Sequence, residues 1–315
     1  MVVAPAVRYV TDFHDSARWD GFEFRADDII ISTPAKCGTT WLQTICALLV
    51  FQTVELDRPL SLISPWLEML TRPRSEVIAD LDAERHRRFI KSHTPLDGLP
   101  FDDRVTYITV ARDPRDVAVS IANHDDNFDD DAFERARART LGGAPGDGDG
   151  GAPYVEPVTA PAPRLDARGR FWEWIDDPAP PPTASSSFVR MLHHLQTFWA
   201  ARARPNVVLL HYADLLGDLD GSMRALAARL EIAVDESRWP VLVEAATFSA
   251  MRGRAEQLAP NIDAGFWRNP TEFFHRGTNG QWRSLLDDHD LVRYRARVDA
   301  LIPPEVAAWI HHGDW

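Results

Sequence analysis

Two lysines stand out in this chain because nearly every other cation is an arginine. Of the 34 Lys and Arg residues only Lys36 and Lys91 are lysines, and each lies in a short motif suited to handling an anion. An ammonium is a compact charge with rotatable donors, whereas a guanidinium is a rigid planar fork. An ammonium suits a site that must stay in contact with one oxygen atom while the bonds to that oxygen change. The pattern therefore favours chemistry on an anionic group. The alternative is that these two lysines remain by chance.

Lys36 lies in a loop between a predicted buried strand and a predicted apolar helix. Such a turn presents backbone N–H groups and the positive end of the helix dipole to an anion. Gly38 allows a close approach of the backbone, and Thr39 and Thr40 add hydroxyl donors. The loop is not a Walker A motif, because the first glycine is missing and the lysine precedes Gly-Thr-Thr. It predicts a phosphate or sulfate site, with an ordinary strand–helix turn as the alternative.

Three further segments carry groups of the same kind. Lys91 and His93 end a predicted strand, and a histidine can act as a general base near neutral pH. Arg112 follows another strand and Ser120 lies on the next helix, so that a guanidinium and a hydroxyl are available for a second phosphate. Residues 275–283 combine glycines, cations and a tryptophan in a loop that suits either a phosphate clamp or a tight turn. Each segment alone also has a purely structural explanation.

The elements that must position these groups alternate between strands and helices, which is typical of a single α/β domain with a mostly parallel central sheet flanked by helices. The predicted strands are 28–32, 88–92, 105–110 and 207–211. The predicted helices are 40–51, one beginning near Pro114, 214–230, 239–246 and 289–301. In open sheets of this class, ligands gather at the carboxyl ends of the strands.

Residues 125–187 depart from this alternation. They contain an acidic cluster followed by Gly-rich and Pro-rich runs, a composition that is poorly ordered on its own. Phe171, Trp172 and Trp174 favour a segment that folds over something apolar. We expect an insertion that acts as a mobile lid or an acceptor-side loop, with an inert insertion as the alternative.

Composition excludes several classes of protein. The net charge of −13 argues against nucleic acid or an anionic membrane as the main partner. Cys37 and Cys46, the only two cysteines, fit a reducing compartment better than a disulfide framework. Residues 1–16 lack the apolar run of a signal peptide, and no stretch approaches the roughly 20 apolar residues of a membrane span. We expect a soluble, cytoplasmic protein without integral membrane association.

Together and in this order, the four motifs resemble those of the cytosolic-type sulfotransferases, which use 3′-phosphoadenosine 5′-phosphosulfate (PAPS) as donor. The segments that carry the resemblance are PAKCGTTW (34–41), KSHTP (91–95), ARDPRDVAVS (111–120) and RGTNGQWR (276–283). The resemblance covers roughly residues 20–290. It implies one domain, 1–315, with a parallel sheet of the P-loop kinase type, and a bacterial member of the family.

The resemblance also implies roles for individual residues. His93 would take the proton of the acceptor hydroxyl, Lys36 would stabilise the bridging oxygen, and Lys91 would assist at the sulfuryl group. In-line transfer would release 3′,5′-ADP and would require no metal. The implied cofactor-binding residues are Lys36, Cys37, Gly38, Thr39, Thr40, Trp41, Arg112, Ser120, Tyr212, Thr247, Phe248, Arg276 and Gly277.

The chain departs from the family pattern in three places. Cys37 stands where Ser is common, and His275 precedes Arg276-Gly277 where the common form is Arg-Lys-Gly. His275 therefore predicts tighter cofactor binding below about pH 6.5. The pattern associated with dimers in animal members is missing from 283–291, which leaves the oligomeric state open.

The acceptor is not specified by any motif. Residues 61–72, which include Trp66, and the 125–187 insertion would line its pocket, and both are apolar or aromatic in places. This indicates an apolar molecule with a hydroxyl, such as a phenol, a sterol-like alcohol or a glycolipid. The alternatives to a sulfotransferase are a small-molecule kinase of the P-loop type and a nucleotide-binding module that has lost its chemistry.

Overall fold

The computed structural model describes residues 2–142 and 165–312, and within them four parallel strands form one sheet. The strands are β1 (Ile29–Ser32), β2 (Phe89–Ser92), β3 (Thr106–Ala111) and β4 (Val207–His211), in the spatial order β2-β1-β3-β4. The register pairs Ile30 with Ile90 and with Tyr107. The predicted α/β fold with a central parallel sheet is confirmed.

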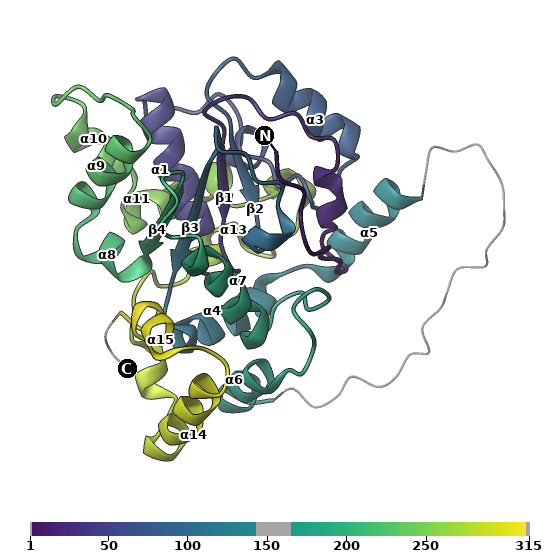
Figure 1. The fold of residues 1–315 in the computed structure, drawn as a ribbon, viewed down its shortest axis with the longest axis vertical. Coiled ribbons are helices and arrows are strands. Elements are labelled where there is room, and N and C mark those ends of the chain that lie inside the picture. The colour runs from purple at the N-terminus through teal and green to yellow at the C-terminus, as the bar shows by residue number, and fades with distance from the viewer. Residues whose placement is uncertain (1, 143–164, 313–315) are drawn as a thin grey trace.

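Helices surround the sheet, with α14 and α15 at the same end of the molecule as α4 and α6 (Figure 1). The helices are α1 (Thr39–Phe51), α2 (Leu60–Ile63), α3 (Arg74–Ala83), α4 (Pro114–Asn127), α5 (Asp130–Leu141), α6 (Ala167–Asp176), α7 (Phe188–Ala200), α8 (Tyr212–Gly217), α9 (Leu219–Arg229), α10 (Trp239–Ala245), α11 (Phe248–Gly253), α12 (Ala255–Leu258), α13 (Pro270–Phe273), α14 (Asp288–Asp299) and α15 (Pro304–Ile310). Short 3₁₀ turns are η1 (Ser16–Trp19), η2 (Leu96–Gly98), η3 (Ile262–Ala264) and η4 (Gln281–Ser284).

The sheet is buried on both faces, as expected for parallel strands covered by helices. Ile29 and Ile31 of β1 join the hydrophobic cluster that contains α1, whereas Ile30 joins the cluster that contains Phe198 of α7. This alternation follows the period of two along a strand. Continuous apolar runs such as Ile-Ile-Ile therefore suit β1.

The strand order creates a crevice at the carboxyl end of β1. The chain moves from β1 to β2 on one side and later to β3 on the other side, so the loops after β1 and β3 diverge from a shared edge. These are the loops that hold Lys36 and Arg112. The fold thus brings together the motifs that the sequence separates.

Two predicted elements differ from the structure. The predicted helix 214–230 is two helices, α8 and α9, because Asp218 leaves the helical conformation (φ −148°) and its side chain accepts a hydrogen bond from the N–H of Gly221 at 2.8 Å. An Asp that caps a new helix in this way ends the preceding one.

The insertion, 125–187, is more regular than its composition suggests. Its described ends form α5 and α6, and Phe171, Trp174 and Ile175 of α6 are buried in the second hydrophobic cluster. The part from 143 to 164 lies outside the described residues. In the described parts of the chain, no helix has the length and apolar character needed to cross a membrane.

Candidate active site

The loop between β1 and α1 has the backbone geometry of an anion site. Lys36 and Gly38 both have positive φ, 63° and 101°, and α1 begins directly afterwards at Thr39. A left-handed conformation at a lysine costs roughly 1–3 kcal/mol and is typical of functional loops. A Cβ atom on Gly38 would lie 3.1 Å from the ring of Tyr212. Thr39 Oγ1 lies 2.5 Å from Thr33 Oγ1, which holds the end of the loop to the strand.

Arg112, at the end of β3, connects this loop to the C-terminal loop. Its Nη1 donates to the carbonyl of Lys36 at 3.0 Å, and its Nη2 donates to the carbonyl of Thr278 at 3.1 Å. The guanidinium lies 4.2 Å from the centre of the Tyr212 ring. Its Nε is buried and has no hydrogen-bond partner among the described residues. Arg112 therefore holds the two loops together at a position where its side chain also lines the cavity.

Asp116 fixes the C-terminal loop from the first turn of α4. Its carboxylate accepts hydrogen bonds from the backbone N–H groups of Gly280 and Gln281, both at 2.7 Å. The side chain is fully buried, and burial raises its pKa. Sequence reasoning missed this role, although Asp116 stands at a fixed place in the Arg-Asp-Pro-Arg-Asp motif. Two backbone N–H groups on one carboxylate hold residues 276–283 against α4.

Gly277 and Phe248 meet at the wall of the site. Gly277 has φ 64°, and a Cβ atom there would lie only 2.2 Å from the Phe248 ring, so this contact requires glycine. Trp41 lies in the first turn of α1 and donates its Nε1–H to the carbonyl of Ala246 at 2.8 Å. Trp41 and Phe248 therefore present two aromatic side chains, each held in place, to a planar ligand.

His93 follows β2 and has a defined tautomer. Its Nδ1 lies 2.7 Å from the carbonyl oxygen of Thr33, which can only accept, so Nδ1 carries the proton. Nε2 is therefore the basic nitrogen. Burial, and next the charge of Lys91, keep the pKa of His93 well below its usual value. Trp66 supports the imidazole edge-on, with ring centres 4.7 Å apart. His93 is thus a neutral imidazole with an available lone pair.

Both lysines have lowered pKa values. Burial, and next the charge of Arg112, lower the pKa of Lys36 to about 7. Burial lowers the pKa of Lys91 to about 8, while the nearby Glu68 acts in the opposite direction. Lys36 Nζ lies 3.3 Å from His124 Nδ1. Ammonium groups with lowered pKa values in a cleft are candidates for chemistry, because a bound anion would restore their charge.

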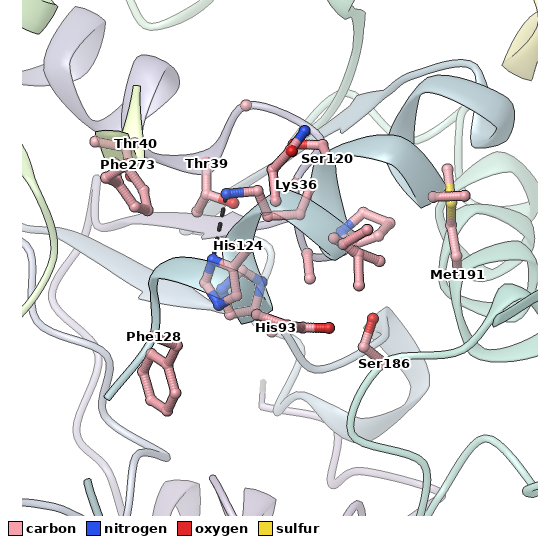
Figure 2. A pocket seen from close by; sticks show the side chains of 18 of the residues that line it. Lys36, Thr39, Thr40, His93, Ser120, His124, Phe128, Ser186, Met191 and Phe273 are labelled. Carbon is pink, nitrogen blue, oxygen red and sulfur yellow. Dashed lines mark hydrogen bonds between the residues drawn. The ribbon is translucent and has the colours of Figure 1, made fainter. Parts of the chain in front are cut away.

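These groups line one cavity of about 890 Å³. We call its two parts the anion end, lined by Gly38, Arg112, Ser120, Phe248 and Gly277, and the aromatic end, lined by Phe13, Trp66, Phe128, Phe266 and Trp267. Figure 2 shows Lys36, His93 and His124 pointing into the cavity. The predicted residues that line it are Lys36, Gly38, Thr39, Thr40, Trp41, Lys91, His93, Arg112, Ser120, Tyr212, Phe248, Arg276 and Gly277.

Two predicted cofactor-binding side chains lie elsewhere. The side chain of Cys37 is fully buried in an apolar cluster with Ala111 and Val117, and burial raises the pKa of its thiol to about 12. An inert thiol explains why Cys can stand in this loop. The Thr247 side chain caps α11, accepting from the N–H of Ala250 at 3.3 Å, and does not line the cavity.

The aromatic end contains residues that no motif indicated. Phe128 packs against Phe13 and Trp267, with ring centres 5.9 and 5.6 Å apart. Trp66, which the sequence placed near the acceptor, does line the cavity, and so do Arg170 and Trp174 from the insertion. Arg170 also donates to Asp126 of α4 at 2.9 Å. Within residues 2–142 and 165–312, no three His, Cys, Asp or Glu side chains gather as a metal site would require.

Comparison with known proteins agrees with this geometry. The model of the sulfotransferase domain family matches residues 26–302. A glycolipid sulfotransferase of Mycobacterium bovis (strain BCG) is 43% identical over 313 residues, which cover 95% of this chain and 92% of that protein. A glycolipid sulfotransferase of Mycobacterium tuberculosis is 42% identical over 311 residues, with the same coverage.

Solved structures show the same fold at low sequence identity. Retinol dehydratase in complex with retinol and PAP aligns with a TM-score of 0.68 at 20% identity, covering 92% of this chain and 85% of that one. A mouse sulfotransferase complexed with PAP aligns with a TM-score of 0.65 at 18% identity, covering 93% and 90%.

Proposed function

This chain belongs to the sulfotransferase domain family and is a sulfotransferase, and we propose that it moves a sulfuryl group from PAPS to a hydroxyl of a glycolipid. The observation that carries the proposal is the single cavity in which an anion loop, a neutral histidine and an aromatic wall meet. PAPS, when bound, supplies a sulfuryl group attached to a phosphate that is a good leaving group. The solved relatives in complex with PAP support this donor.

The residues at the anion end fit such a nucleotide. The backbone of the loop before α1 suits the 5′-phosphosulfate, since the helix start offers N–H groups and Thr39 and Thr40 offer hydroxyls. Arg112 and Ser120 suit the 3′-phosphate, because a guanidinium and a hydroxyl line the same cavity. Arg276 makes no hydrogen bond or ion pair with any residue that the structure describes, and its guanidinium is exposed at the cavity.

Trp41 and Phe248 suit the adenine ring. Both line the cavity next to the loop, and the Gly277–Phe248 contact fixes one of the two rings. Aromatic rings stack well on the π-face of a base. The anion end thus offers a place for each part of a 3′-phosphorylated adenine nucleotide.

His93 is the general base in this proposal. The Thr33 carbonyl holds Nδ1–H, and this leaves Nε2 to take the proton of the acceptor hydroxyl. Lys36 would stabilise the charge that develops on the bridging oxygen of bound PAPS, and Lys91 would assist at the sulfuryl group. Alignment and charge stabilisation are the main tasks of a protein in this kind of group transfer. General-base catalysis of this type contributes about 10²–10⁴-fold.

The aromatic end supports an acceptor with an apolar part. Phe13, Phe128 and Trp267 offer ring surfaces, whereas Arg170 and Asp125 at the same cavity offer polar contacts. A molecule with both a lipid and a sugar part matches this mixture. The two mycobacterial relatives named as glycolipid sulfotransferases support the same acceptor class. We also infer a cytoplasmic location, which fits the two free, buried cysteines.

The test is a transfer assay with PAPS and a panel of glycolipids, phenols and sterol alcohols, read by mass spectrometry. We expect a sulfated glycolipid with wild type and none with His93→Ala. Tight binding of 3′,5′-ADP without any sulfated product would instead indicate a nucleotide-binding module. Transfer from ATP with Mg²⁺, and none from PAPS, would indicate a kinase.

A further inference from the structure

A second histidine touches the catalytic lysine from the acceptor side. His124 Nδ1 lies 3.3 Å from Lys36 Nζ, the contact drawn as a dashed line in Figure 2. His124 lies on α4 four residues after Ser120, so both side chains occupy one face of the helix. One helix thus contributes Ser120 to the anion end and His124 to the boundary with the aromatic end.

The His124 ring is held in place by aromatic neighbours. It stacks on Phe128, with ring centres 5.8 Å apart and planes 12° apart, and it meets the edge of Trp267 at 5.0 Å. Both neighbours belong to the aromatic end. The orientation of the ring is therefore fixed by packing as well as by the contact with Lys36.

The contact with Lys36 also fixes the tautomer of His124. When an anion bound in the cavity keeps Lys36 charged, its ammonium group can only donate a hydrogen bond, so His124 Nδ1 accepts and its proton is on Nε2. His93 has the opposite tautomer, because its Nδ1 donates to the carbonyl of Thr33. The Nε2 of His124 has no partner within the described parts of the chain, and the residue lines the cavity. Among the histidines that line the cavity, His93 thus presents a lone pair and His124 presents an N–H.

We propose that His124 is a second functional histidine, whose Nδ1 positions the Lys36 ammonium and whose Nε2–H donates to an oxygen of the acceptor. The proposal rests on the proposed sulfuryl transfer. It specifies the acceptor further: beside the hydroxyl that loses its proton to His93, the acceptor carries a second oxygen that accepts from His124. A sugar with two hydroxyls, of which a vicinal diol is the simplest case, meets this requirement, whereas a simple phenol does not. His124 is then a positioning residue toward Lys36 and a specificity-determining residue toward the acceptor.

Three variants separate these two roles from simple packing. His124→Phe keeps an aromatic ring against Phe128 and removes both nitrogens. His124→Asn places an amide oxygen near the position of Nδ1, where it can accept from Lys36. His124→Gln places an amide N–H near the position of Nε2, where it can donate to the acceptor.

The kinetic test compares a glycolipid that has a vicinal diol with its monodeoxy analogue. We expect wild type to prefer the diol by about 10-fold or more in kcat/KM, in keeping with one buried hydrogen bond. His124→Phe should lose this preference, together with about 10-fold in kcat, while its Kd for 3′,5′-ADP stays within about 3-fold. His124→Gln should restore the preference, and His124→Asn should restore kcat. A His124→Phe enzyme with wild-type kcat and preference would overturn the proposal.

A spectroscopic test does not depend on turnover. The chain has two lysines, so selective ¹⁵N-lysine labelling gives two side-chain signals, assigned with Lys36→Arg. His124→Phe should shift the Lys36 signal and leave the Lys91 signal unchanged. In ¹⁵N-histidine spectra, assigned by substitution, His124 should be protonated on Nε2 and His93 on Nδ1. Unshifted lysine signals, or the same tautomer for both histidines, would refute the contact. If wild type sulfates no acceptor, the proposed function and the acceptor half of this inference fail, while these spectra still decide the Lys36 half.

Discussion

The two ends of the cavity are built by different forces. At the anion end, hydrogen bonds connect segments far apart in the sequence: Arg112 bonds to the backbone at Lys36 and Thr278, and Asp116 bonds to the loop at Gly280. At the aromatic end, side chains such as Phe128 and Trp267 meet mainly through ring packing. Directional bonds define one set of positions, whereas ring contacts tolerate several shapes.

This difference explains what each end can recognise. A hydrogen-bonded frame discriminates strongly, because a ligand that lacks the matching group leaves polar groups of the site without a partner. An apolar wall discriminates weakly, since a methylene in such a pocket is worth only about 1–3 kcal/mol. We therefore expect strict selectivity for the nucleotide and broader tolerance for the lipid part of the acceptor.

Removal of the proposed base, His93, distinguishes catalysis from nucleotide binding with the largest expected effect. His93→Ala should lower turnover by about 10²–10⁴-fold, because the acceptor hydroxyl loses its base. Affinity for 3′,5′-ADP should stay within a few-fold, since no contact at the anion end is lost. Steady-state kinetics and calorimetry measure the two quantities. Loss of both together would show that His93 is structural.

The next largest effect concerns the lysine at the boundary. Lys36→Arg should lower kcat by at least about 10²-fold, because a planar fork cannot replace a compact ammonium in the space beside His124 and Phe273. The measurement is single-turnover transfer from PAPS. A fully active variant would mean that any positive charge suffices at this position.

A glycine substitution tests the rigidity of the anion end alone. Gly277→Ala should weaken 3′,5′-ADP binding by about 10-fold or more, because its Cβ would displace the Phe248 ring. Gly21→Ala is the matched control, since Gly21 has a similar φ of 69° and open space around it. Equal affinities of the two variants would contradict the close contact. Turnover with saturating nucleotide should change little in either variant.

The smallest expected effect is a pH dependence at His275. Partial burial, and next the charge of Arg276, lower the pKa of His275, so it becomes positive only as the pH falls below about 6.5. That charge would then favour the 3′-phosphate by about 2- to 5-fold, the size expected for a partly exposed pair. Affinity for 3′,5′-ADP should therefore rise more steeply toward low pH in wild type than in His275→Ala. Equal slopes would remove His275 from the site.

The contrast between local and long-range contacts also explains which parts of the fold and the site could be predicted from the sequence. The strands were predictable because their apolar runs are local features of the sequence, and the four motifs were predictable because together they resemble those of a known family. Asp116 and His124 were missed, since their partners, Gly280 and Lys36, are distant in the sequence and become neighbours only in the folded sheet.

Two sequence features, Cys37 and the composition of 125–187, led to expectations that differ from the structure. Cys37 lies in the correct motif, but its side chain points into an apolar cluster, a direction that depends on the positive φ of Lys36 and Gly38. The composition of 125–187 favoured a loop, yet Phe171 and Trp174 gain enough burial to support α6. Tertiary packing decides both cases.

The account's central claim is a site built for a 3′-phosphorylated adenine nucleotide, and calorimetric titration with 3′,5′-ADP and with ADP tests it most directly. We predict that 3′,5′-ADP binds at least about 10²-fold more tightly, since charge-assisted hydrogen bonds from Arg112 and Arg276 are each worth about 1.5–3 kcal/mol. Arg276→Ala should remove about half of this difference in binding free energy and leave the affinity for ADP nearly unchanged, because Arg276 holds no other segment of the described chain in place. Equal binding of the two nucleotides by wild type would contradict the claim and would indicate a generic phosphate loop.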